Sequence, residues 1–135
     1  MAGLRLPAKL ENLSRFITFV GNSAKASGFN GLRLREIELC TEEAIVNIIN
    51  YAYSGEDGHV EITCRDEGER GFVIEIMDWG KPFDIKSIPI PEINTDVLER
   101  KIGGLGIFFI NELMDEVKYS REEDKNILTL VVYKQ

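Results

Sequence analysis

The sequence predicts a two-layer α/β sandwich in which three helices cover one face of a mixed, mainly antiparallel β-sheet. Segments with helical periodicity are interspersed with segments in which apolar and polar residues alternate. The strand-like segments occur as neighbours joined by short turns, which is typical of antiparallel pairing. The length of 135 residues, with 44% hydrophobic residues, suits one hydrophobic core, so residues 1–135 are expected to form a single domain.

The first half of the chain is expected to hold two helices between two strands. Residues 3–9 (GLRLPAK) predict a short strand, and Pro7 restricts it to an edge or an end of the sheet. Residues 11–29 carry apolar side chains at helical spacing until GFNGL breaks the pattern. A second helix is expected from about residue 32 to residue 53. The segment HVEITCRDEG then follows the turn SGEDG and predicts a strand.

The second half is expected to add a long loop, a helix and three strands. The segment FVIEIMDWG predicts a strand that pairs with the preceding one. Residues 80–104 contain three prolines and little periodicity. A loop of about 25 residues is uncommon in a compact domain unless it is functional or disordered. The segment LGIFFINELMDEV predicts a helix, and KYSREE with NILTLVVYK predicts a closing hairpin.

Composition excludes several kinds of protein. The net charge of −7 argues against a general nucleic-acid binder, whose affinity would need a basic surface. No apolar run approaches the roughly 20 residues of a membrane span, and the N-terminus lacks the apolar core of a secretion signal. We therefore expect a cytoplasmic protein without nucleic-acid or membrane partners. Cys40 and Cys64 are predicted to be buried free thiols, and His59 an exposed turn residue.

Polar residues follow one strip of the second helix. At 100° per residue, Glu36, Glu43, Asn47 and Asn50 fall within a band of roughly 60°, with apolar residues on both flanks. Such a strip is compatible with a solvated helix surface. It is also compatible with a metal-phosphate site, because an Asn oxygen is a suitable Mg²⁺ ligand and a nearby Glu can accept a proton. Both interpretations stay open on this helix alone.

Two further segments contain glycines next to polar groups. Asp78 and Gly80 lie at the end of a strand, where a carboxylate can accept a hydrogen bond from an exocyclic amine and a glycine admits a flat ring. A plain turn explains the same pair. Gly103–Gly106 open the third helix, a position that suits anions, or they form a hinge. Arg100 and Lys101 precede them and could add positive charge near a phosphate.

The three signals in this order resemble the ATP-binding domain of histidine kinases and gyrase-type ATPases. ExxxN lies on a helix, DxG follows at a strand end, and a long loop ends in GxG at a helix start. The short form without further domains looks like the bacterial anti-sigma-factor serine/threonine kinases. The resemblance covers essentially the whole chain and includes EEAIVNIINYAY, IMDWGKPFD and GGLGIFFINELMDEVKYS. It implies the histidine-kinase-like ATPase fold.

The resemblance also implies roles for individual residues. Glu43 matches the general base, Asn47 the Mg²⁺ ligand, and Asp78 the carboxylate that binds the adenine amine above Gly80. Residues 81–103 match the ATP lid. The last strand of the family often carries a Gly-Thr pair that faces adenine, for which this chain offers Thr129. The remaining residues implied to contact the nucleotide are Asn50, Arg100, Lys101, Gly103, Gly104, Leu105 and Gly106.

The function implied by the resemblance is transfer of the γ-phosphate from ATP, with Mg²⁺, to Ser or Thr of a STAS-type anti-anti-sigma protein. The family also sequesters a sigma factor and usually forms homodimers. Two alternatives remain. One is an ATP-binding regulatory module that switches partners without phosphotransfer, and the other is a detached sensor-kinase ATP domain that acts in trans on a histidine.

Overall fold

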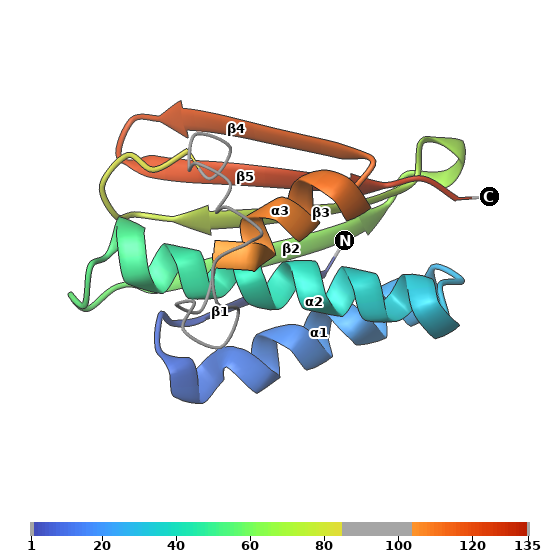
Figure 1. The fold of residues 1–135 in the computed structure, drawn as a ribbon, viewed down its shortest axis with the longest axis horizontal. Helices are drawn as coiled ribbons and strands as arrows, with labels where there is room; N and C mark the ends of the chain where they lie inside the picture. The colour runs from blue at the N-terminus through green and yellow to red at the C-terminus, as the bar shows by residue number, and fades with distance from the viewer. Residues whose placement is uncertain (1, 85–103, 135) are drawn as a thin grey trace, which may run out of the picture.

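The computed structural model describes residues 2–84 and 104–134, which form a five-stranded sheet with three α-helices on one face (Figure 1). The strand order is β1-β2-β3-β5-β4, and all four pairings among the described residues are antiparallel. The strands are β1 Ala2–Pro7, β2 His59–Asp66, β3 Phe72–Asp78, β4 Glu116–Glu122 and β5 Lys125–Val132. The helices are α1 Leu13–Ala26, α2 Gly31–Asn47 and α3 Gly104–Leu113.

This arrangement confirms the predicted two-layer α/β sandwich. β1, with Pro7 at its end, forms one edge of the sheet, as the proline requires. The hairpin of β4 and β5 also forms as expected. The sheet carries no parallel pairing in its described part, so the expected mixed character is not seen there.

The core lies between the sheet and the helices. Alternate strand residues point toward the helices, since side chains of a strand alternate between its two faces. The helices contribute apolar side chains at spacings of three and four residues. The fully buried side chains of this layer include Phe16, Val20, Ile37, Ile45, Val60, Ile62, Ile74, Ile76, Ile110 and Leu130.

The end of α2 departs from the regular helix predicted for residues 32–53. After Asn47 the chain forms a π-helical turn, Ile48–Ala52, in which the Tyr53 N–H donates to the Ile48 carbonyl at 3.1 Å. The wide turn brings the Ala52 carbonyl to the Lys81 N–H at 3.0 Å. A Cβ on Gly80 would lie 2.5 Å from the same carbonyl oxygen, so glycine is required there.

Arg33 connects α2 with the end of α3. Its guanidinium donates to the Leu113 carbonyl at 2.6 Å and to the Asp115 carboxylate at 2.9 Å. The carbonyl groups of the last turn of a helix lack partners inside the helix, so this arginine completes the C-terminus of α3. The contact fixes how α3 lies along α2.

Other predictions concern single residues. Cys40 and Cys64 are free and buried, as expected, and burial raises the pKa of Cys40 to about 12 and that of Cys64 to about 11. His59 is exposed at the start of β2, also as expected. Among the described residues, none of the helices combines the length and the apolar character needed to cross a bilayer.

The two faces of β2 provide a test of the layer arrangement. Ile62 is fully buried against the helices, whereas its neighbour Thr63 lies on the other face and is partly exposed. We expect Ile62→Ala to lower the free energy of unfolding by about 2–5 kcal/mol, because it leaves a cavity in the core. Thr63→Ala should cost less than about 1 kcal/mol. Urea unfolding of both variants measures the difference, and equal losses would contradict the assignment of faces.

Candidate functional site

Asp78 and Asn126 form a buried polar pair at the end of the sheet. They lie opposite each other in the register of β3 and β5, and both point toward the helix layer. Asp78 is 2% exposed and Asn126 is 3% exposed. The Asn126 amide donates to Oδ1 of Asp78 at 2.9 Å, and the Gly80 N–H donates to the same oxygen at 3.0 Å. Oδ2 of Asp78 accepts no hydrogen bond from the described residues, which leaves it for a further donor.

The environment of Asp78 acts on its charge in two directions. Burial raises the pKa of this carboxyl group above its ordinary value, because a buried charge loses solvation. The hydrogen bonds from Asn126 and Gly80, and the nearby Arg121 guanidinium, oppose that rise. The guanidinium itself donates to the Gly80 carbonyl at 2.8 Å. The donors around Oδ1 thus favour the ionised, acceptor-only form of the carboxylate.

Glu43 and Asn47 form the second polar pair, on α2. The Asn47 amide donates to the Glu43 carbonyl at 2.6 Å. Oδ1 of Asn47 and Oε2 of Glu43 are both buried, yet neither has a hydrogen-bond partner among the described residues. Burial, and then the charge of Glu42, raises the pKa of Glu43. Buried acceptors without donors are rare in folded proteins and call for an explanation.

The two orphaned oxygens suit a cation and a proton donor. Asn47 Oδ1 is a neutral, hard oxygen of the kind that Mg²⁺ takes when most of its other ligands are water and phosphate. The described residues contain no group of three or more His, Cys, Asp or Glu side chains that could hold a metal ion by themselves. A Mg²⁺ ion at Asn47 would therefore depend on ligands from a bound phosphate. The polar strip of α2 fits such a site better than a solvated surface.

A small space adjoins the pair of Asp78 and Asn126. It measures about 10 Å³ and is lined by residues that include Ile48, Asp78, Phe83 and Leu128. That is barely the volume of one water molecule. Phe83 also stacks on Tyr51, with ring centroids 5.2 Å apart and planes at 9°. A purine could reach Asp78 only if Phe83 moves.

The structure does not bring every predicted residue to this site. Asn50 is exposed and lies in the π-helical turn that follows Asn47. Gly104, Leu105 and Gly106 form the first turn of α3, in agreement with the predicted helix start. Arg100, Lys101, Gly103 and most of the expected lid, residues 81–103, lie outside the described residues.

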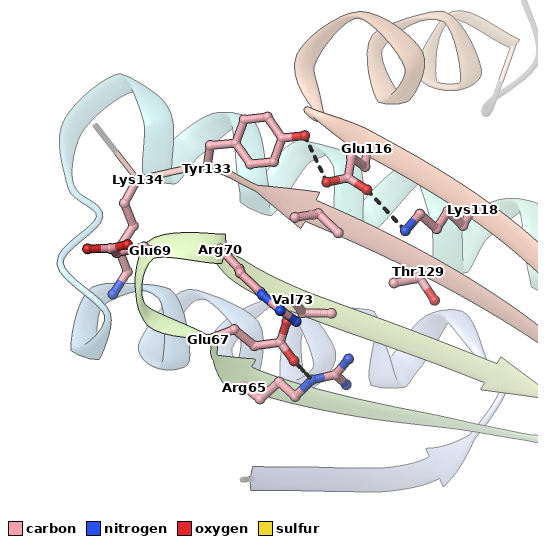
Figure 2. Close-up of a pocket in the computed structure, with 11 residues that line it drawn as sticks. Arg65, Glu67, Glu69, Arg70, Val73, Glu116, Lys118, Thr129, Tyr133 and Lys134 are labelled. Carbon is pink, nitrogen blue, oxygen red and sulfur yellow. Dashed lines mark hydrogen bonds and ion pairs between the residues drawn. The ribbon is translucent and has the colours of Figure 1, made fainter.

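The structure corrects the position implied for Thr129, which was expected to face adenine. Leu128 and Leu130 on either side of it are buried toward the helices, so Thr129 points to the opposite face of the sheet from Asp78. Thr129 lines an open groove of about 650 Å³ on that outer face. Figure 2 shows it near Lys118 and the hydrogen-bonded side chains of Arg65 and Glu67. Thr129 therefore cannot face a base bound at Asp78.

Asn126 is the site residue that sequence reasoning missed. The resemblance implied Thr129 on the last strand, whereas the polar group next to Asp78 comes from Asn126, three residues earlier. The alternation of side chains between the two faces of a strand was the signal that could have identified Asn126. Asn126 shares a face with Leu128 and Leu130, both of which occupy apolar positions in the alternating pattern.

Comparison with known proteins shows the family of the chain. Residues 6–132 match the family model described as the histidine kinase-like ATPase domain. The chain belongs to the histidine kinase-like ATPase family. Within this family it is 30% identical over 130 residues to a protein of Listeria innocua named serine-protein kinase RsbW, covering 93% of this chain and 82% of that one. A protein of the same name from Bacillus cereus is 28% identical over 131 residues, covering 93% and 80%.

A solved structure supports the same family fold. The histidine kinase domain from the Erythrobacter litoralis EL346 blue-light activated histidine kinase superposes with a TM-score of 0.54 at 16% identity. The match covers 90% of this chain and 60% of that one. The family model and the curated relatives confirm the predicted family, and the solved structure confirms the predicted histidine-kinase-like ATPase fold.

The raised pKa of Glu43 predicts a pH-dependent stability difference. A carboxyl group whose pKa is higher in the folded than in the unfolded protein binds more protons when folded, so its contribution to stability is lost as pH rises through the folded pKa. Glu43→Gln has no carboxyl group at this position, so it does not lose this contribution to stability as pH rises. We expect the variant to gain stability relative to the parent as pH rises above the ordinary value of 4.5, and no gain well below it. Urea unfolding from acid to neutral pH measures the difference.

The control for this measurement is Glu122→Gln, at an exposed position at the end of β4. Its stability relative to the parent should not follow the same curve. A Glu43→Gln variant that loses stability relative to the parent with rising pH would show that the Glu43 carboxylate is stabilised, not strained, by its surroundings.

Proposed function

We propose that this chain is an anti-sigma factor and Mg²⁺-dependent protein serine/threonine kinase. It would use ATP to phosphorylate a STAS-type anti-anti-sigma protein and would sequester a sigma factor. The observation that carries the proposal is the pair of orphaned, buried oxygens on Glu43 and Asn47. The similarity to proteins named serine-protein kinase supports the same activity.

In this proposal the nucleotide lies between the end of β3 and the start of α3. Asp78 Oδ2 accepts a hydrogen bond from the exocyclic amine of adenine, and Gly80 leaves room for the ring. The N–H groups at Gly104, Leu105 and Gly106 bind phosphate oxygens, because the first turn of a helix has N–H groups without partners inside the helix. Arg100 or Lys101 adds positive charge, and residues 81–103 act as the lid.

Asn47 would hold Mg²⁺ through its orphaned Oδ1. The bound ion supplies neutralisation of the phosphate charge that otherwise repels an attacking oxygen. Asn47 is already fixed for this role, since its amide nitrogen is held by the Glu43 carbonyl of the preceding helical turn.

Glu43 would act as the general base. It accepts the proton of a serine or threonine hydroxyl while the hydroxyl oxygen forms a bond to the γ-phosphorus. The bond from the γ-phosphorus to the bridging oxygen breaks, and ADP leaves with that electron pair. A carboxylate with a raised pKa takes up a proton more readily, which suits the burial of Glu43.

The proposal extends to assembly and location. The chain would function as a single ATP-binding domain in a homodimer in the cytoplasm. Its net charge of −7 suits a partner surface with basic residues. The alternative is an ATP-binding module that switches partners without phosphotransfer. The exposed position of Asn50, an uncharged amide, favours that alternative because it adds no positive charge for a phosphate.

Phosphotransfer is tested by incubation with γ-labelled ATP, Mg²⁺ and candidate STAS proteins. We expect acid-stable label on the STAS protein. Glu43→Gln should slow labelling by about 10²–10⁴-fold, the usual contribution of a general base, while ATP binding remains. Asn47→Ala should slow labelling and raise the Mg²⁺ concentration that labelling needs. Glu122→Gln, at the exposed end of β4, is the control and should label at the parent rate.

The other outcomes separate the alternatives. ATP binding without label on any STAS protein would favour the regulatory module. Acid-labile label on a histidine would favour a sensor-kinase domain acting in trans. Failure to bind any adenine nucleotide would contradict all three readings.

A further inference from the structure

Asn126 has an unusual number of hydrogen-bond partners for one side chain. Its amide nitrogen donates to Asp78 Oδ1 at 2.9 Å and to the Lys81 carbonyl at 2.8 Å. Its oxygen accepts from the Tyr119 hydroxyl at 2.6 Å and from the Phe83 N–H at 3.3 Å. The Arg121 guanidinium lies at 3.4 Å from the same oxygen. Asn126 thus links β3, β4, β5 and the segment that follows β3.

The partners fix which way the amide points. Asp78 and the Lys81 carbonyl are acceptors and require the amide nitrogen, whereas the Phe83 N–H requires the oxygen, which also accepts from the Tyr119 hydroxyl. Reversing the amide would place its oxygen against two acceptors and its N–H groups against the Phe83 N–H. The side chain is therefore held in one orientation, and the Asp78 carboxylate next to it is held as well.

The two carboxylate oxygens of Asp78 therefore differ in their hydrogen bonding. Oδ1 is occupied by the donors from Asn126 and Gly80, and Oδ2 has none among the described residues. An ionised carboxylate can only accept hydrogen bonds. Oδ2 would bind a base with an exocyclic amine at this position and would repel one that presents a carbonyl oxygen. Adenine and guanine differ in this way at the 6-position of the purine ring.

We propose that Asn126 is a positioning residue for the nucleobase, which holds Asp78 with Oδ2 free for the amine of a 6-aminopurine and so sets the preference for ATP over GTP. The inference rests on the proposed nucleotide site. It adds a residue to that site and names the step at which the base is selected. Nothing in it requires phosphotransfer to occur.

A second effect of Asn126 must be separated from base selection. By binding the Lys81 carbonyl and the Phe83 N–H, it also holds the segment that covers the site. Loss of those contacts would change the affinity for both nucleotides alike. The ratio of ATP to GTP affinity is therefore the informative quantity, since a purely structural role would leave the ratio unchanged.

The experiment measures ATP and GTP binding to the full chain by calorimetric titration. The parent protein should prefer ATP. Asn126→Ala should reduce the ratio of ATP to GTP affinity by about tenfold, since a hydrogen bond to a charged group is lost and the carboxylate is freed. Asn22→Ala, at an exposed amide on α1, is the matched control and should keep the parent ratio.

Asn126→Asp provides a second arm that gives a result even if Asn126→Ala does not fold. The new carboxyl group would face Asp78 on β3 and both Tyr119 and Arg121 on β4, with Tyr53 also near Asp78. While the carboxyl pair shares one proton, its O–H can donate to Asp78 as the amide did. Loss of that proton leaves two like charges in contact.

The sign of the pH effect follows. For Asn126→Asp, the ratio of ATP to GTP affinity should fall as pH rises between about pH 6 and about pH 9, because the shared proton is lost. For the parent, the ratio should fall only toward acid pH, where Asp78 takes up a proton. ATP and GTP carry the same triphosphate, so the effect of its ionisation on affinity cancels in the ratio.

Each outcome decides a point. A lower ratio in Asn126→Ala, or the inverted pH slope in Asn126→Asp, supports the role of Asn126. A parent that prefers ATP, with an unchanged ratio in Asn126→Ala and no slope in Asn126→Asp, overturns this inference and leaves the proposed function standing. A folded parent that binds neither nucleotide overturns both.

Discussion

Buried oxygen atoms need hydrogen-bond donors, and this requirement governs the helix-facing layer of the molecule. The sheet and the helices enclose two polar pairs in apolar surroundings, Asp78 with Asn126 and Glu43 with Asn47. The first pair is nearly satisfied by its own neighbours. The second retains one oxygen on each residue without a donor. A domain selected only for stability would fill these positions with apolar side chains, because unpaired buried acceptors cost free energy.

In the proposed nucleotide site the two pairs have different roles. Asp78 lies at the end of a central strand whose register is set by long pairings on both sides, so its position is rigid. Glu43 and Asn47 lie one helical turn apart on α2, which packs on the sheet with its isoleucines. The π-helical turn after Asn47 then connects the helix to Gly80. Rigid elements thus hold the polar groups, and the segment carrying Phe83 is the part that must move.

Local sequence pattern was enough to predict most of the architecture. Periods of two and of 3.6 residues predicted the strands and helices, and the i,i+4 spacing of Glu43 and Asn47 put both on one strip. Asn126 was missed because its role depends on the register of two strands far apart in the sequence. Thr129 was misassigned because alternate residues of β5 face opposite sides of the sheet, and Thr129 lies on the side away from Asp78. The π-helical turn that contains Asn50 could not be predicted either, because no composition signal announces it.

The central claim is that the orphaned oxygen of Asn47 is a ligand for the metal of a bound nucleotide. Binding of ATP with Mn²⁺ in place of Mg²⁺, followed by NMR of the side-chain amides, tests it directly. The paramagnetic ion should broaden the Asn47 amide signal beyond detection and leave that of Asn22, exposed on α1, unchanged. A sharp Asn47 signal in the fully nucleotide-bound protein would contradict the account.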